Sequence, residues 1–366
     1  MNSATFDFAV VGGGPAGLAA STLLAAGGAR VLLIDAARTA AFKAGEFIHP
    51  KVKAFINRLA VLQEGWEASH LPIHGLVNSW ASVTPRETDF IFNPNGPALA
   101  LDRQLFERQL LDTASSRGVE TRLGWTAKGM EMANNLSWRV ELSAANDLAY
   151  CDARYLLLAT GRRSAPSISN VQRRKFDRLA FLAAHIIGPV VDCRPIIECF
   201  ENGWVYMTPL PGDARVVYVF FDPRLGLPCH RTLESLRSAL KSCSRLSTLL
   251  DEISCKEDAK IEWFSGAASS HLANRTAGQN WCFLGDLAES RDPLSTSGLF
   301  NALRDASRMA AHLLSGQMTG KACEEMHLER VQSFADYLKT RHSYYEEETR
   351  WNGFPFWSGK GGLVAS

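Results

Sequence analysis

The sequence lacks several features that mark common classes of protein. Its 39 basic and 38 acidic residues give a net charge of +1, so no overall field attracts nucleic acid or an acidic membrane surface. None of its eight cysteines forms a CxxC pair, which argues against a zinc site and against a dithiol redox couple. We therefore expect reduced thiols, no metal and no nucleic-acid partner.

Uninterrupted hydrophobic runs of membrane-spanning length are also missing. The apolar stretch 8–34 is broken at residues 12–17 by three successive glycines, a proline and a further glycine. No basic segment precedes this stretch, so it fits neither a signal peptide nor a membrane span. We expect a cytoplasmic protein with no membrane partner.

The same glycines belong to the motif "VVGGGPAGLAAS" at residues 10–21. The pattern predicts a buried strand over 6–11, a helix of small residues over 17–26 and a second buried strand over 30–35. In such a unit Gly12 permits the tight turn, Gly14 lets a pyrophosphate approach the backbone, and Gly17 lets the helix pack on the strand. The helix N-terminus offers N–H groups and a positive dipole end to phosphate, and Pro15 and Ala16, just before the expected helix, are counted among the cofactor-binding residues.

An acidic residue completes this motif. Asp35 lies 18 residues beyond Gly17, at the end of the second strand, where its carboxylate can accept hydrogen bonds from ribose hydroxyls. A carboxylate favours an unphosphorylated ribose, as in FAD or NAD, over NADP. It does not separate FAD from NAD.

The remaining pattern predicts an α/β protein in which a sheet domain interrupts a nucleotide-binding domain. Helical patterns occupy 46–62, 101–118, 232–250 and about 298–314, and an irregular region with four prolines covers 66–98. Strands are expected near 138–142, 154–159 and 281–286. Successive strand-like runs over 179–222, with short connections, indicate an antiparallel sheet.

Six segments, which together span almost the whole chain, carry a family resemblance. They are "VVGGGPAGLAAS" (10–21), "AGEFIHP" (44–50), "LDRQLFERQLL" (101–111), "LLLATGRRS" (156–164), "GWVYMTPLPG" (203–212) and "LGDLAESRDPLSTSGLFNALRDA" (284–306). In this order they resemble the flavoprotein monooxygenases and flavin-dependent halogenases, whose fold resembles that of p-hydroxybenzoate hydroxylase. The resemblance implies an FAD-dependent, monooxygenase-like oxidoreductase.

The resemblance also implies the division of the chain. The FAD-binding Rossmann-like domain is expected from 1–70, 98–170 and 270–320, with an inserted antiparallel-sheet substrate domain from 71–97 and 171–269. Residues 321–366 would form a helical C-terminal tail.

Further cofactor contacts follow from the resemblance alone. It implies that Gly285 and Asp286 reach the FAD ribityl chain and that Arg103 lies near the phosphates. Gly161 would belong to the same site, and the loop 293–298 would lie beside the isoalloxazine ring. The loop residues singled out are Pro293, Ser297 and Gly298. Each of these residues also has a purely structural interpretation. Arg103 would pair with Glu107 at helical spacing, Asp286 would cap a helix, and Glu46 would be an acidic residue near a helix start.

Two departures from the family bear on the reaction. Thr160-Gly161 stands where hydroxylases that use NAD(P)H directly carry Asp-Gly, so we expect slow direct reduction and a separate electron donor. The halogenase motif WxWxIP matches Trp204-Val205-Tyr206-Met207-Thr208-Pro209, with its second Trp and its Ile replaced by Tyr206 and Thr208, and neither Lys43 nor Lys51 sits in a convincing context for the halogenase lysine. Trp204 and Tyr206 are candidate substrate-facing residues, or strand residues facing a core.

His49 is the best acid/base candidate among the nine histidines, with a structural, hydrogen-bonded histidine as the alternative. The tail "ETRWNGFPFW" resembles that of LodB-like accessory flavoproteins, which serve cysteine tryptophylquinone biogenesis. This resemblance implies oxygenation of a tryptophan on the precursor of a quinone-cofactor amino-acid oxidase. The alternatives are a halogenase, a small-molecule aromatic hydroxylase, an alkene-saturating reductase, a flavin-containing chaperone without turnover, and a tail that merely seals the two domains.

Overall fold

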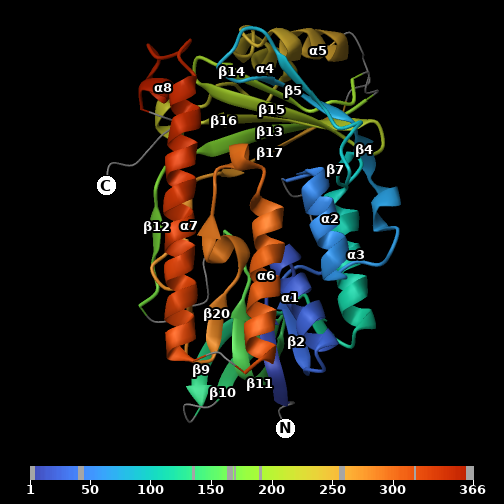
Figure 1. Cartoon of the computed structure of the whole chain (residues 1–366), viewed down its shortest axis with the longest axis vertical. Helices are drawn as coiled ribbons and strands as arrows, with labels where there is room; N and C mark the ends of the chain where they lie inside the picture. The colour runs from blue at the N-terminus through green and yellow to red at the C-terminus, as the bar shows by residue number, and fades with distance from the viewer. Residues whose placement is uncertain are drawn as a thin grey trace.

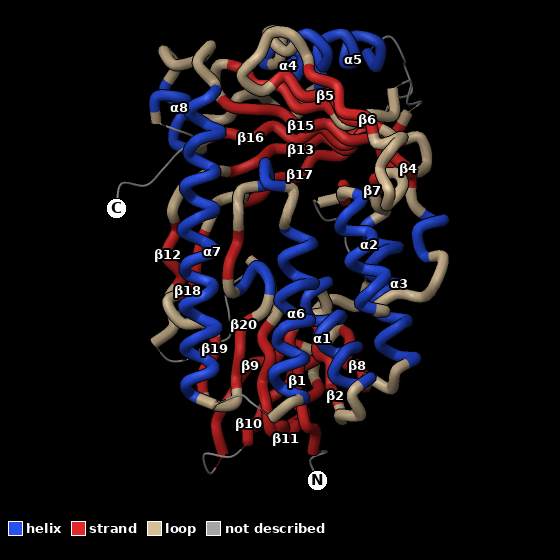
Figure 2. Tube along the Cα trace, in the orientation of Figure 1, coloured by secondary structure: helices blue, strands red, loops and turns tan. Residues whose placement is uncertain are grey.

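Two large sheets lie at opposite ends of the molecule, with helices between and beside them (Figures 1 and 2). The computed structural model describes residues 5–39, 45–133, 137–162, 168, 170–188, 192–254, 260–316 and 319–359. We call the two sheets the lower and the upper sheet, after their places in Figure 1.

The lower sheet has eight strands and a parallel centre. Its main order is β19 (Ala277–Gly278), β20 (Trp281–Phe283), β11 (Asp147–Leu158), β1 (Thr5–Val11), β2 (Val31–Asp35) and β8 (Glu120–Leu123). The strands from β20 to β8 pair in parallel, and β9 (Thr126–Ala133) and β10 (Ser137–Ala144) extend β11 as an antiparallel arm. Because the central strands are covered on both faces, they read as continuous apolar runs rather than as alternating ones.

Three helices cover one face of the lower sheet. They are α1 (Pro15–Ala26), α3 (Arg103–Ser116) and α6 (Gly298–Leu314). The small residues of α1 let it pack between α3 and α6, and its leucines enter a core with Val10 and Leu33.

The upper sheet has seven strands and is antiparallel except for one parallel pair. Its order is β17 (Lys260–Ala267), β13 (Ala180–Ile187), β16 (Ala214–Phe221), β15 (Gly203–Leu210), β14 (Ile196–Phe200), β5 (Gly75–Ser79) and β6 (Arg86–Asp89). The parallel pair is β5 and β14. Helices α4 (Leu233–Ala239) and α5 (Ser244–Ser254) cover its outer face (Figure 1). The side chains on the face toward the lower half include many aromatic rings.

Shorter elements connect the sheets. One small sheet joins β3 (Phe47–Ile48), β7 (Ala98–Ala100) and β4 (Leu71–Ile73), and another joins β12 (Arg173–Lys175), β18 (His271–Ala273) and β21 (Glu289–Ser290). Helix α2 (Pro50–Leu59) follows β3. The 3-10 turns are η1 (Trp66–Ser69), η2 (Pro223–Leu225), η3 (Gly285–Leu287) and η4 (Pro293–Ser295).

The 28-residue helix α7 (Gly320–Glu347) runs from the lower sheet to the upper sheet (Figure 1). At a rise of 1.5 Å per residue it spans about 42 Å. It leads into α8 (Pro355–Ser358), where Phe356 and Trp357 are buried against the upper sheet and Trp357 Nε1 donates to the Phe200 carbonyl at 2.8 Å. The aromatic residues Phe356 and Trp357 of the tail therefore have a packing role.

Most predicted elements are confirmed, with two differences. The helix expected within 46–62, after His49-Pro50, begins at Pro50 as expected but ends at Leu59, because Ala60 takes a left-handed conformation with φ of 51°. The irregular region 66–98 contributes β5 and β6 to the upper sheet, which makes that sheet mixed rather than fully antiparallel. The domain boundaries themselves stay a prediction.

Within the described ranges, seven cysteines are free thiols, and no cluster of His, Cys, Asp or Glu side chains is arranged to hold a metal ion. None of the helices in these ranges is both long and apolar enough to cross a bilayer.

Candidate active site

Several of the predicted cofactor-binding residues gather at one edge of the lower sheet. The strands β1, β2, β11 and β20 are parallel, so their carboxyl ends meet there. Gly12 follows β1, Asp35 ends β2, Gly161 follows β11 and Gly285 follows β20. The carboxyl edge of an open parallel sheet is the usual place for a nucleotide.

Two glycines of the first turn are required by the fold, and a third leaves open space. A Cβ atom at Gly12 would lie 2.4 Å from the Ala159 carbonyl oxygen, and one at Gly17 would lie 1.9 Å from the Gly12 carbonyl oxygen. A Cβ at Gly14 would meet nothing within 4 Å, and its φ of −82° suits any residue. The fold therefore needs glycine at Gly12 and Gly17, whereas the space beside Gly14 is open to a ligand.

Helix α1 begins at this open space. Gly14 is its N-cap, Pro15 is its first residue, and no side chain caps its first N–H groups. These groups, including that of Ala16, suit a phosphate, which matches the positive end of the helix dipole. The cradle thus fits the pyrophosphate of a dinucleotide.

Asp35 is fixed beside the glycine turn. One carboxylate oxygen accepts the Gly13 N–H, and the other accepts the Ala37 N–H at 2.7 Å. Each oxygen retains a lone pair. Its role as a ribose acceptor stays a prediction.

Arg103 adopts the helical pairing weighed as an alternative. Its guanidinium donates to Glu107 at 2.8 Å, with the two side chains 9% and 3% exposed, and to the Gly45 carbonyl at 3.1 Å. It therefore ties α3 to the segment before β3. A contact with the FAD phosphates stays a prediction.

Gly285 and Asp286 are held by polar contacts from three sides. The Gly285 N–H donates to Asp305 at 2.8 Å, and Arg162 Nε lies 3.2 Å from the Asp286 carboxylate. His271 Nε2 lies 2.8 Å from the Asp286 carbonyl oxygen, and burial lowers the pKa of His271 to about 4. His271 is therefore neutral near pH 7 and able to donate to that carbonyl. The predicted contact of this pair with the ribityl chain is untested.

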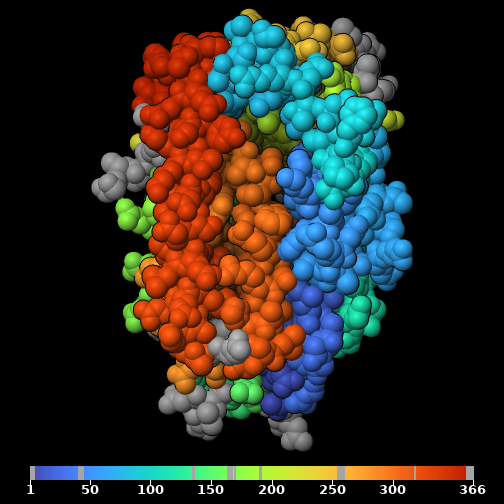
Figure 3. Space-filling model, viewed as in Figure 1, coloured from blue at the N-terminus to red at the C-terminus, as the bar shows by residue number. Residues whose placement is uncertain are grey.

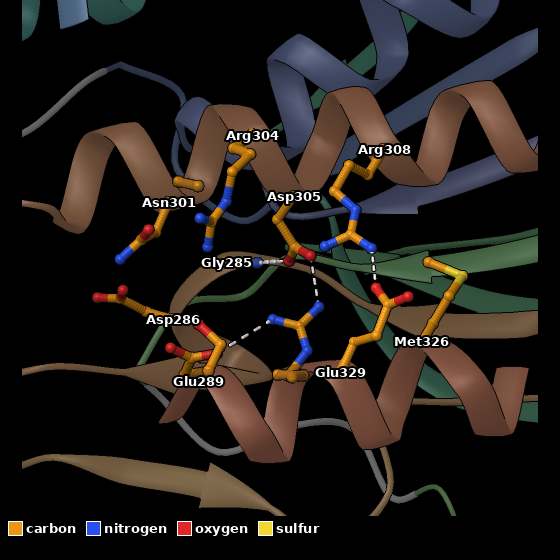
Figure 4. A pocket seen from close by; sticks show the side chains of 12 residues that line it. Gly285, Asp286, Glu289, Asn301, Arg304, Asp305, Arg308, Met326 and Glu329 are labelled. Carbon is orange, nitrogen blue, oxygen red and sulfur yellow. Dashed lines mark hydrogen bonds and ion pairs between the residues drawn. The ribbon is translucent and has the colours of Figure 1, made fainter. Parts of the chain in front are cut away.

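Behind Gly285 lies a charged pocket between α6 and α7 (Figure 4). Arg330 forms ion pairs with Asp305 and Glu289, and Arg308 pairs with Glu329. In the space-filling view α6 and α7 lie side by side with a narrow groove between them (Figure 3). Arg330 is connected to the backbone of η3 through Asp305, which accepts the Gly285 N–H.

The loop 293–298 precedes α6. Thr296 has a φ of 45°, and Ser297 Oγ is engaged by Asn301 Nδ2 at 3.1 Å rather than by a capping N–H. A Cβ at Gly298 would meet nothing within 4 Å, and the same holds at Gly161. The start of α6 at Gly298 therefore borders open space, which the predicted position of the isoalloxazine ring beside this loop requires.

The loop is anchored through the residue before it, which the sequence did not single out. Asp292 is 1% exposed and accepts hydrogen bonds from Arg341 Nε and Tyr345 Oη, both at 2.8 Å. Tyr345 Oη also accepts a hydrogen bond from Trp204 Nε1 at 3.0 Å, and Trp204 stacks on Phe220 at 3.9 Å. Trp204 is thus buried in a structural network.

Tyr206 and Glu46 form a different cluster. Tyr218 donates a hydrogen bond to Glu46, which is 1% exposed, and the rings of Tyr206 and Tyr218 are nearly parallel at 6.3 Å. Burial raises the pKa of Glu46. Glu46 is therefore not a helix-start acid, and Tyr218 had no sequence signal beyond its alternation with Phe220.

His49 has a structural role in this conformation. Its Nδ1 accepts the Lys51 N–H at 3.2 Å and caps α2, and its ring meets Phe90 edge to face. Burial lowers the pKa of His49, so it favours the neutral form. Its acid/base role is untested, and Lys43 lies outside the described residues.

Comparison with known proteins identifies the family. A family described as an FAD binding domain matches residues 5–333. The chain belongs to this family. Its cofactor is FAD, and it is an FAD-dependent oxidoreductase of the flavin monooxygenase and halogenase group.

Similar proteins differ in activity. Flavin-dependent halogenase armH5 of Armillaria mellea is 25% identical over 361 residues, covering 86% of this chain and 65% of the relative. Menaquinone reductase of Mycolicibacterium smegmatis is 27% identical over 332 residues, covering 86% and 77%. The chain thus spans about two thirds of the length of the first halogenase.

Solved structures share the fold. The myxobacterial chondrochloren halogenase CndH has a TM-score of 0.81 at 20% identity, covering 99% of this chain and 87% of its own. The peptidyl tryptophan dihydroxylase QhpG, essential for tryptophylquinone cofactor biogenesis, has a TM-score of 0.73 at 21% identity, covering 98% and 79%. At these identities the likeness establishes the fold alone.

Proposed function

We propose that this chain is an FAD-dependent oxygenase that inserts oxygen into a tryptophan of a precursor protein during cysteine tryptophylquinone biogenesis. The observation that carries the proposal is the departure of residues 204–209 from the halogenase motif WxWxIP. Tyr206 and Thr208 replace the second tryptophan and the isoleucine of that motif, and Trp204, its first tryptophan, is 1% exposed and hydrogen-bonded to Tyr345 of α7.

Two further observations support a peptidyl tryptophan. The first is the resemblance of the C-terminal tail to that of LodB-like accessory flavoproteins, although Phe356 and Trp357 of this tail serve to pack it against the upper sheet. The fold covers 79% of QhpG, a protein that acts on peptidyl tryptophan.

The chemistry sets what the residues of the chain must provide. When bound, FAD supplies two electrons and the place at which dioxygen is activated. One oxygen atom enters a ring C–H bond to give C–OH, and the other leaves as water with two electrons and two protons. The aromatic face of the upper sheet would orient the electron-rich ring and exclude water above the loop 293–298.

The electrons would come from a separate donor, a reduced nicotinamide or flavin bound to another protein. Thr160 stands where direct NAD(P)H users carry an aspartate. Its hydroxyl is buried without a hydrogen-bond partner in the described part of the chain. A neutral side chain here removes the carboxylate that the Asp-Gly pair supplies.

A halogenase is the second candidate, because several of the similar proteins are flavin-dependent halogenases. In that case a halide would replace the ring hydrogen, and the product would gain halogen rather than oxygen. A binding partner that only chaperones the precursor would leave the tryptophan unmodified.

The test is co-expression of the precursor of the quinone-cofactor oxidase with wild-type protein, with Gly14→Val, or with Gly320→Val. Gly14→Val is designed to exclude FAD, whereas Gly320 borders no atom within 4 Å, begins α7 and serves as the matched control. Peptide mass mapping should show added oxygen at the tryptophan with wild type and Gly320→Val, and none with Gly14→Val. Halogen addition, or equal modification in all samples, would refute the proposal.

A further inference from the structure

Two tyrosines lie on the face of the upper sheet that is turned toward the lower half. Tyr206 of β15 and Tyr218 of β16 are directly opposite in the antiparallel register, and their rings lie 6.3 Å apart at 17°. Leu294, from the loop 293–298, packs against the same cluster of side chains. The pair and the loop that is expected to meet the flavin ring therefore belong to one cluster of packed side chains.

The hydroxyl of Tyr218 has only one direction in which to donate. It donates its proton to Oε1 of Glu46, while Oε2 of Glu46 accepts the Gly45 N–H at 3.0 Å. Arg103 lies close enough that its positive charge lowers the pKa of Glu46 against the effect of burial. With its hydrogen committed to Glu46, the Tyr218 oxygen can offer a neighbour only a lone pair.

The hydroxyl of Tyr206 is also buried, and it makes no hydrogen bond within the ranges that the structure describes. Burial raises the pKa of Tyr206, the nearby Thr208 hydroxyl lowers it without reaching hydrogen-bond geometry, and the negative charge of Glu46 raises it further. A buried hydroxyl without a partner is costly, and a ligand atom that bonds to it removes the cost.

We propose that Tyr218, oriented by Glu46, and Tyr206 form a subsite that selects aromatic rings bearing an N–H or O–H donor. Glu46 acts as a positioning residue, since it makes the Tyr218 oxygen an acceptor. An indole N–H or a phenol O–H satisfies this oxygen, whereas an N-methyl or methoxy group leaves it unpaired. The inference rests on the proposed aromatic substrate and adds the chemical feature by which the ring is recognised.

The test measures binding in the resting holoprotein, so it needs no turnover. The probes are N-acetyl-tryptophanamide and its 1-methyl analogue, titrated by calorimetry and by the change in flavin absorbance. Wild type should bind the N–H probe about 3- to 10-fold more tightly, the range expected for one neutral hydrogen bond. Tyr218→Phe should reduce this preference to about onefold, and Tyr206→Phe should reduce it in part.

Glu46 is tested by a pair of variants with equal flavin content. Glu46→Gln keeps an acceptor for Tyr218 and should retain the preference, whereas Glu46→Leu frees the Tyr218 hydrogen and should lose it. Tyr150→Phe, which removes a hydroxyl from a 51% exposed ring on the lower sheet, is the control and should match wild type.

Equal affinities for the two probes in wild type, no measurable binding of either, or an undiminished preference in Tyr218→Phe would overturn the inference. Failure of the proposed function gives a different result. Peptide mapping would then show no oxygen at the partner tryptophan, while the preference for N–H probes in the resting protein persists.

Discussion

Replacing Arg341 by methionine tests the network that anchors the loop before α6. The Arg341 side chain is 2% exposed and lies between two carboxylates, 2.8 Å from Asp292 and 3.8 Å from Asp177, with Tyr345 under its guanidinium at 4.4 Å. Methionine fills much of the volume but leaves two buried carboxylates facing each other. Removing one partner of a buried ion pair costs about 3–5 kcal/mol, a large part of the stability of a typical domain.

The assay is urea unfolding of the holoprotein followed by tryptophan fluorescence. Arg308→Met is the matched control, because Arg308 and its partner Glu329 are 49% and 61% exposed and such pairs contribute less than about 1 kcal/mol. The Arg341 variant should also regain stability on acidification, when a carboxylate takes up a proton. A loss no larger than that of Arg308→Met would refute the reasoning.

Three further predictions follow from the site. Gly14→Val should fold, with wild-type circular dichroism, but purify colourless. Gly17→Val should fail to fold, because a Cβ at residue 17 would lie 1.9 Å from a backbone oxygen, whereas one at residue 14 meets no atom within 4 Å. A yellow, folded Gly14→Val would contradict the phosphate cradle. NADH or NADPH alone should reduce the flavin slowly and without saturation in anaerobic stopped flow, given Thr160 in place of aspartate, and fast saturable reduction would contradict a separate donor. The pKa of His271 falls from 6.5 to about 4 on folding, so between these pH values only the unfolded chain binds the proton. The free energy of unfolding should therefore drop by up to about 3 kcal/mol from pH 6.5 to pH 4. His271→Gln should flatten this dependence of stability on pH, and an unchanged dependence would exclude His271 as its source.

The sequence was most informative where the chemistry is local. The glycine turn and the two strands that flank it and α1 follow from residues within one short segment and were predicted correctly, whereas α1 begins at Pro15 rather than at the expected Gly17. Asp35 was placed correctly at the end of β2, but its hydrogen bond to the Gly13 N–H depends on the exact path of the turn.

Contacts between distant segments could not be predicted in the same way. Glu46 and Tyr218 are 172 positions apart, and Trp204 and Tyr345 are 141 apart. No periodicity links such pairs, since they meet only when the upper sheet and α7 have packed. A buried arginine such as Arg341 reads as surface charge until its partners are known.

The central claim, flavin-dependent oxygenation of a partner tryptophan, is tested most directly by isotope labelling. The precursor is incubated with the holoprotein, a reductant and oxygen-18 gas, and the tryptophan peptide is analysed by mass spectrometry. The account predicts that the heavy isotope enters this tryptophan from the gas and that Gly14→Val abolishes the labelling. An unlabelled tryptophan, or label that appears equally with Gly14→Val, would contradict it.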